Sequence, residues 1–182
     1  MIDQTLLTQI AANLSALAAR IEGASVESGR TLSLPFAAIR EGYPRDGLAV
    51  LHDWAGSAQA GAQYIYRIAV SEQVASETLH AAFRDAKDKK LGNRAYARLH
   101  QVSRTLYVGS SSSLMSRLKQ HLGFGPKGTY AMQICHWLPA IDGALQIQVW
   151  RFAEDIPREV VQAIEDGLWA ASNPMFGRQG AR

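Results

Sequence analysis

The chain has little cysteine and no long apolar runs. It carries one cysteine, Cys135, among 182 residues, which excludes an internal disulfide and a cysteine-based zinc site. No apolar run is long enough to span a membrane, and the first residues lack the basic start of a secretory signal. We therefore expect no membrane association and a cytoplasmic location, where thiols stay reduced.

Acidic residues are missing from the middle of the chain. The stretch from Leu91 to Ala140 contains no Asp or Glu but six basic residues. A tract whose charges are all positive favours binding to a polyanion such as nucleic acid. The alternative is a solvent-exposed face whose charge is balanced by acidic residues elsewhere in the fold. The six are Arg94, Arg98, Arg104, Arg117, Lys119 and Lys127.

The stretch from Thr105 to Leu122 predicts a strand, a turn and a helix. Residues 106–108 are apolar and favour a strand, and Gly109 with three following serines predicts the turn. Arg117 and His121 are four residues apart, so they lie on one face of the helix. The buried helical positions are predicted to be Leu114, Leu118 and Leu122. The turn lacks the Lys of a P-loop, but tyrosine, arginine and histidine together suit a phosphate.

Two further strands and a helix follow from periodicity. Residues 62–70 give the strongest strand signal, and residues 144–152 alternate cleanly between apolar and polar. Residues 155–172 predict a helix that ends before Asn173-Pro174. Glu165 flanks the buried stripe of that helix, so its carboxylate is expected at the edge of a cleft.

The other segments are less distinct. Residues 3–22 predict an amphipathic helix, either docked on its own domain or forming a homodimer contact. Residues 23–46 contain Gly, Ser and two prolines and predict a loop, followed by a short strand at 48–51. Between the first two strong strands, residues 73–90 predict one helix and residues 93–103 a second.

These segments, taken in order, resemble the GIY-YIG nuclease family. Tyr107-Val108-Gly109 matches the second tripeptide of the family, and Arg117 follows this glycine at the family's spacing. Tyr64-Ile65-Tyr66 stands at the first tripeptide, with Tyr64 in place of glycine. The ending from Asn173 to Gly177 is also similar. The resemblance covers residues 62–180, and the insertion at 73–103 is similar to members of restriction-enzyme type.

The resemblance implies roles for individual residues. The catalytic set would be Tyr66, Tyr107, Arg117, His121, Glu165 and Asn173. Glu165 would bind Mg²⁺ or Mn²⁺, and the two tyrosines would share water activation, without a choice between them. Nucleic-acid contacts are predicted for Gly109, Ser110, Arg94, Arg98, Arg104, Lys119 and Lys127.

The fold expected is α/β (α+β), with a central mixed or antiparallel sheet of three strands flanked by helices. Residues 62–182 would form the GIY-YIG-like domain and residues 1–61 a helix and loop extension. The function predicted is a metal-dependent DNA endonuclease, in restriction, defence or repair. The alternative is a non-catalytic nucleic-acid-binding module on the same fold. The sequence does not decide whether the substrate is DNA or RNA, or whether it is single- or double-stranded.

Overall fold

The computed structural model describes residues 2–180, so the last two residues of the expected 62–182 domain lie outside it. One antiparallel sheet contains four strands in the order β1-β4-β2-β3. The mixed α/β class is confirmed, but the sheet has one strand more than predicted. The strands are β1 Val26–Pro35, β2 Gln63–Val70, β3 Thr105–Ser111 and β4 Ala144–Phe152.

Strand β1 lies where the sequence predicted a loop. Its residues pair with β4 from Val26 opposite Phe152 to Pro35 opposite Ala144. Pro35 ends the strand and Pro44 precedes a helix, so neither proline removes a hydrogen bond from the middle of an element. Few side chains of β1 are buried, which weakens the alternation that identifies a strand. Residues 1–61 therefore contribute an edge strand to the sheet.

Two helices follow β1. They are α2 Phe36–Glu41 and α3 Arg45–Gly56. The short strand predicted at residues 48–51 is wrong, because these residues lie inside α3. Its buried positions are Leu48, Leu51 and Trp54, a spacing of three residues that matches one face of a helix.

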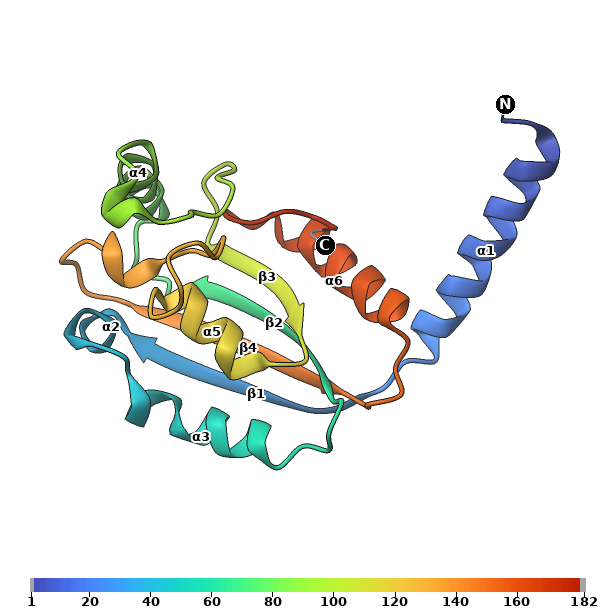
Figure 1. The fold of residues 1–182 in the computed structure, drawn as a ribbon, viewed down its shortest axis with the longest axis horizontal. Helices are drawn as coiled ribbons and strands as arrows, with labels where there is room; N and C mark the ends of the chain where they lie inside the picture. The colour runs from blue at the N-terminus through green and yellow to red at the C-terminus, as the bar shows by residue number, and fades with distance from the viewer. Residues whose placement is uncertain (1, 181–182) are drawn as a thin grey trace.

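The two faces of the sheet carry different helices (Figure 1). Helix α5, Leu114–Leu122, lies over the face that bears Tyr66, whereas α6, Arg158–Ser172, runs beside the edge strand β3. On the α6 face, Ile65 packs with Val161 and Phe152. Residues 65 and 66 thus point to opposite sides, as successive residues of a strand must.

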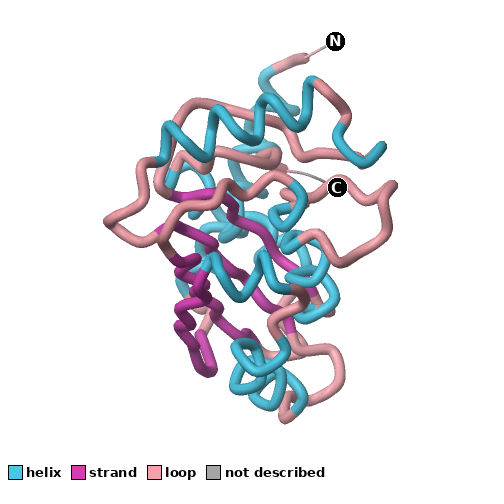
Figure 2. Tube along the Cα trace, turned by 90° about the vertical axis from the view of Figure 1, so that its left-hand side faces the viewer, coloured by secondary structure: helices cyan, strands magenta, loops and turns pink. Residues whose placement is uncertain are grey.

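The insertion between β2 and β3 is only partly helical. Helix α4, Ser76–Asp88, confirms the first predicted helix. The second, at 93–103, is wrong, since a short 3₁₀ turn at Leu91–Asn93 is followed by extended chain. Its backbone bonds to distant segments: Ala97 N–H donates to Ala131 O and His100 N–H to Met175 O. Figure 2 views the molecule from the end that carries α2 and α4 and shows the strands with helices and loops around them.

The predicted N-terminal helix is confirmed as α1, Gln4–Glu22. The Asp3 side chain caps it by accepting the N–H of Leu6 at 2.8 Å. Helix α1 extends away from the sheet (Figure 1) and is joined to α6 by an Arg20–Glu159 ion pair at 2.6 Å. No residue of α1 is buried, so a homodimer contact through it stays a prediction. None of the helices between residues 2 and 180 could cross a membrane.

Candidate active site

The centre of the site is a buried pair between β2 and α5. The hydroxyl oxygen of Tyr66 lies 3.0 Å from Nε2 of His121, and neither side chain is exposed to solvent. Nδ1 of His121 is buried without a hydrogen-bond partner in the described part of the chain. The pair is therefore held by one hydrogen bond and by the packing around it, and Nδ1 of His121 is the polar atom without a partner.

Gly109 makes room for this pair. The strand register places it directly opposite Tyr66. A Cβ on Gly109 would lie 2.7 Å from the Tyr66 hydroxyl and 2.8 Å from Cε1 of Tyr107. The prediction of a turn at residues 109–112 is thus wrong for 109–111, which belong to β3. The glycine is needed because two tyrosine rings meet over it, with centroids 6.2 Å apart.

Tyr107 and Arg117 extend the cluster towards the surface. The Arg117 guanidinium donates to the Tyr107 hydroxyl at 3.3 Å and to Gln120 Oε1 at 2.7 Å. The Tyr107 ring also contacts that of His121, with centroids 4.1 Å apart. Five of the predicted site residues therefore form one cluster: Tyr66, Tyr107, Gly109, Arg117 and His121.

Burial determines the ionisation of the central pair. It raises the pKa of Tyr66 well above its ordinary value of 10. Burial, with the nearby charge of Arg117, lowers the pKa of His121 well below 6.5. Both groups are neutral at pH 7, so they form a neutral support beneath the Tyr107 ring.

A groove of about 620 Å³ opens beside this cluster. Tyr107 and Arg117 form part of its wall, and no Asp or Glu lines it among residues 2–180. We call it the cationic groove, defined by Lys87, Arg98, Tyr107, Arg117, Tyr130 and Arg178. Such a lining suits a phosphate backbone.

The cationic groove contains residues that the sequence did not single out. Lys87 comes from the end of α4 and Arg178 from the C-terminal tail. Gly177 brings the tail close, since a Cβ there would lie 2.8 Å from Cε2 of Tyr107. No local pattern marks these residues, because the groove is assembled from four distant segments of the chain.

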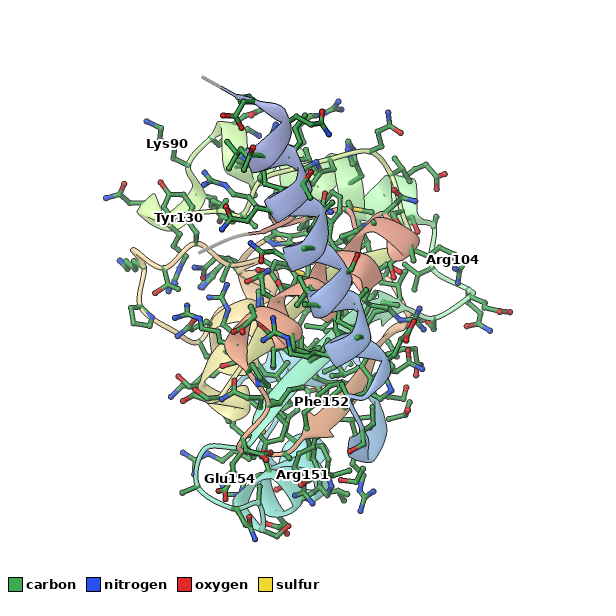
Figure 3. The ribbon with its side chains drawn as sticks, turned by 90° about the vertical axis from the view of Figure 1, so that its right-hand side faces the viewer. Lys90, Arg104, Tyr130, Arg151, Phe152 and Glu154 are labelled. Carbon is green, nitrogen blue, oxygen red and sulfur yellow. The ribbon has the colours of Figure 1, made fainter. Side chains whose placement is uncertain are left out.

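Most of the predicted basic contacts lie elsewhere. Arg94 donates to Gln133 Oε1 at 3.0 Å, and Lys119 lies over the ring of Tyr43. Arg104 stands on the side of the molecule opposite Tyr130 (Figure 3). Lys127 is exposed in the loop after α5. Of the predicted basic tract, only Arg98 and Arg117 line the cationic groove.

Glu165 approaches β3 from its other face. It lies in α6, is 7% exposed, and accepts a hydrogen bond from the Ser110 hydroxyl. Ser110 follows Gly109 in the strand, so the two residues point to opposite faces. Burial raises the pKa of Glu165, and the Ser110 hydrogen bond opposes this shift. The carboxyl group is thus held at the margin of the core by a hydrogen bond from β3.

The residues present fit a cation held by a single carboxylate. No group of three His, Cys, Asp or Glu side chains that could hold a metal occurs in the part of the chain that the structure describes. Mg²⁺ accepts one carboxylate with water and phosphate oxygens as its other ligands. Glu165 with its Ser110 partner suits that arrangement, whereas a site built wholly from protein side chains would need more ligands.

Asn173 does not join this cluster. It ends α6 in a left-handed conformation, with φ of 44°, and its side chain is exposed. No hydrogen bond between Asn173 and Glu165 occurs among residues 2–180, so the predicted support of Glu165 is not seen. Asn173 lines a separate pocket together with His100 and Trp169.

Comparison of the chain with protein-family models, with curated proteins and with solved structures gave no match. The likeness to GIY-YIG nucleases therefore stays a prediction from the sequence motif. The contacts of Tyr66, Tyr107 and Arg117 supply independent geometry from which to argue a function.

Proposed function

We propose that this protein is a divalent-metal-dependent endonuclease that hydrolyses phosphodiester bonds in DNA through a GIY-YIG-like site. The supporting observation is the meeting of Tyr107 and Arg117 at the wall of the cationic groove. The Arg117 guanidinium donates a hydrogen bond to the Tyr107 hydroxyl there, and the groove is also lined by Lys87, Arg98 and Arg178. A phosphate in this groove would meet both groups.

Arg117 is the phosphate-binding residue in this proposal. Its planar guanidinium offers several N–H donors, which allows bidentate contact with phosphate oxygens. The bonds to Tyr107 and Gln120 fix its orientation before substrate arrives. Lys87, Arg98 and Arg178 would contact neighbouring phosphates and position the strand.

The two tyrosines have different roles here. Tyr107 lines the groove, and its oxygen accepts from Arg117, which leaves its own O–H free to donate to a phosphate or orient a water. Tyr66 is fully buried behind it and bonded to His121. Tyr107 is therefore the catalytic tyrosine of this proposal, and Tyr66 and His121 are positioning residues that hold its ring.

Glu165 would hold the Mg²⁺ or Mn²⁺ ion. The Ser110 hydroxyl orients its carboxylate, as groups bonded to a metal-binding carboxylate commonly do. When bound, such an ion polarises a phosphate oxygen and lowers the pKa of a coordinated water. Glu165 lies on the α6 face of β3. Burial raises the pKa of its carboxyl group and the charge of Arg117 opposes that rise, so the two groups are within electrostatic reach of each other.

Cleavage of labelled DNA tests the proposal. Supercoiled plasmid and a labelled single strand are incubated with the pure protein and Mg²⁺, Mn²⁺ or EDTA. Arg117→Ala and Glu165→Ala are each expected to lower the rate at least about 100-fold, the loss typical of one transition-state contact. The matched controls are Arg30→Ala and Glu159→Ala, both at exposed positions, which should cleave like the wild type.

Either of two results would overturn the nuclease proposal. One is cleavage that persists in both site variants, which would indicate a contaminating enzyme. The other is absence of cleavage with salt-sensitive DNA binding that Arg117→Ala weakens and Glu165→Ala leaves unchanged. That second result would establish the alternative, a non-catalytic nucleic-acid-binding module.

A further inference from the structure

A second hollow, of about 710 Å³, lies beside the cationic groove and has a different lining. We call it the aromatic pocket, and it is lined by His80, His100, Gln101, Val102, Trp169, Asn173 and Pro174. No Lys, Arg, Asp or Glu lines it within residues 2–180. Its volume lies in the range of small-ligand sites, about 300–1,000 Å³. Its surface offers aromatic rings, amides and apolar side chains.

The pocket and the groove share two segments of the chain. Leu99 and Phe176 pair in an antiparallel bridge, and Gly177 N–H donates to Arg98 O at 2.9 Å. His100, which lines the pocket, bonds through Nε2 to the carbonyl of Gly177, which lines the groove. One hydrogen bond of 2.8 Å thus joins the two walls.

The hydrogen-bond partners of two histidines in the pocket show which ring nitrogen carries the hydrogen. A carbonyl oxygen only accepts, so Nε2 of His100 donates to Gly177 O and Nε2 of His80 donates to His100 O at 2.9 Å. In the neutral rings Nδ1 is then an acceptor. The indole N–H of Trp169 is buried and has no acceptor among the described residues, and a buried donor without a partner is uncommon in native proteins.

The aromatic walls are already arranged. The ring of Trp169 meets that of His100 edge to face, with centroids 5.5 Å apart and an interplanar angle of 80°. Asn173 sits at the end of α6, one turn after Trp169, in its left-handed conformation. Rings for stacking and an amide for hydrogen bonds are what proteins use to hold unstacked bases.

We propose that the aromatic pocket binds one unstacked nucleobase of the strand whose phosphates lie in the cationic groove. The placement beside the groove rests on the proposed function, whereas the recognition of a base does not. A phosphate would find no Lys or Arg side chain among the described residues that line this pocket. A base would stack on the Trp169 and His100 rings that line the pocket and hydrogen-bond to the Asn173 amide. The substrate is then a single strand or a duplex opened at the site.

Uncharged nucleosides test this pocket apart from the groove, because they carry no phosphate. The full chain, labelled with ¹⁵N, is titrated with adenosine, guanosine, cytidine and thymidine. Trp169→Phe identifies the indole N–H signal of Trp169. At least one nucleoside is expected to shift that signal saturably, with a Kd of about 1–10 mM, while the indole signals of the other three tryptophans move less.

Two glycine variants supply a matched control. Asn173 and Asn93 both have positive φ, 44° and 53°, so replacing either by glycine relieves the same backbone conformation. Asn173→Gly removes an amide from the pocket and should weaken nucleoside binding at least about fivefold, the loss of one hydrogen bond. Asn93→Gly lies outside the pocket and should bind like the wild type.

The outcomes separate this proposal from the nuclease proposal. Nucleoside binding at Trp169 without any DNA cleavage would support the base pocket and overturn the nuclease. Cleavage with no shift of the Trp169 signal at saturating nucleoside would overturn the base pocket alone. Equal weakening by Asn173→Gly and Asn93→Gly would also overturn it, since the effect would then be structural. A Trp169 shift abolished only by Asn173→Gly would support it.

Discussion

The two faces of strand β3 hold their polar groups in different ways. On the α5 face, Tyr66 and His121 are fully buried and neutral. On the α6 face, Glu165 retains slight exposure and accepts from Ser110. Only the step from Gly109 to Ser110 separates the two environments. The innermost pair on the α5 face is neutral and enclosed by packing, whereas the carboxyl group on the α6 face is oriented by a hydrogen bond from the strand itself.

The largest effect is expected from Gly109→Ala. The new methyl group would lie 2.7 Å from the Tyr66 hydroxyl and 2.8 Å from the Tyr107 ring. Both rings are buried, so overpacking should lower the free energy of unfolding by about 1–3 kcal/mol and, under the proposed function, abolish cleavage. Denaturant unfolding measures the first effect.

Gly167→Ala is the matched control for Gly109→Ala. Gly167 lies in α6, and a Cβ there meets no atom within 4 Å. Alanine should stabilise this helix by up to about 1 kcal/mol. If both variants unfolded at the same denaturant concentration, the packing argument for Gly109 would be wrong.

The next largest effect is expected from Tyr66→Phe. Loss of the hydroxyl leaves both nitrogens of His121 without a protein partner, which should cost about 1–3 kcal/mol of stability. His121→Leu in the Tyr66→Phe background removes the unpaired polar group and should recover part of that loss. A double-mutant cycle on unfolding free energies measures the coupling, and simple additivity of the two changes would contradict the pairing.

The buried His121 should also make stability depend on pH. Its pKa is lowered by burial in the folded state, so below the ordinary value of 6.5 the unfolded chain binds a proton that the folded chain does not. Stability contributed by neutral His121 is present above pH 6.5 and is lost as the pH falls towards the folded pKa. The slope reaches about 1.4 kcal/mol per pH unit.

His121→Leu isolates that slope from the other histidines. The free energy of unfolding of wild type and variant is compared between about pH 7.5 and 5, across the ordinary histidine pKa. The variant should lose less stability than the wild type on acidification. Parallel curves would show that His121 takes up a proton in the folded state as well.

The smallest effect on stability is expected on the α6 face. Glu165→Gln keeps an oxygen that accepts from Ser110 and removes a charge that burial disfavours. Its free energy of unfolding should stay within about 1 kcal/mol of the wild type, while metal-dependent cleavage is lost under the proposed function. If Glu165→Gln lowered the free energy of unfolding as much as Gly109→Ala, the contrast between the two faces would be wrong, because packing would then determine stability on both.

The local pattern of apolar and polar residues was enough to predict the secondary-structure elements near the site. Residues 62–70 and 144–152 alternate and form strands, and Leu114, Leu118 and Leu122 are buried at the spacing of a helix. The same reasoning did not find β1, since its exposed edge position leaves little alternation. It predicted a helix at 93–103, where backbone groups bond instead to residues 131 and 175.

The sequence by itself determined which side chains could meet. Strand alternation places Tyr107 and Gly109 on one face of β3, and helical spacing places Arg117 and His121 on one face of α5, because these periods are set by backbone geometry. Tyr66 was assigned to the set only through the resemblance. The tertiary structure alone decided the rest. In the folded chain Tyr66 is buried, whereas Tyr107 lines the groove. The basic residues of the tract lie on several surfaces, and Asn173 lines a different pocket. Exposure and distant contacts depend on how the elements pack, and no local period encodes that packing.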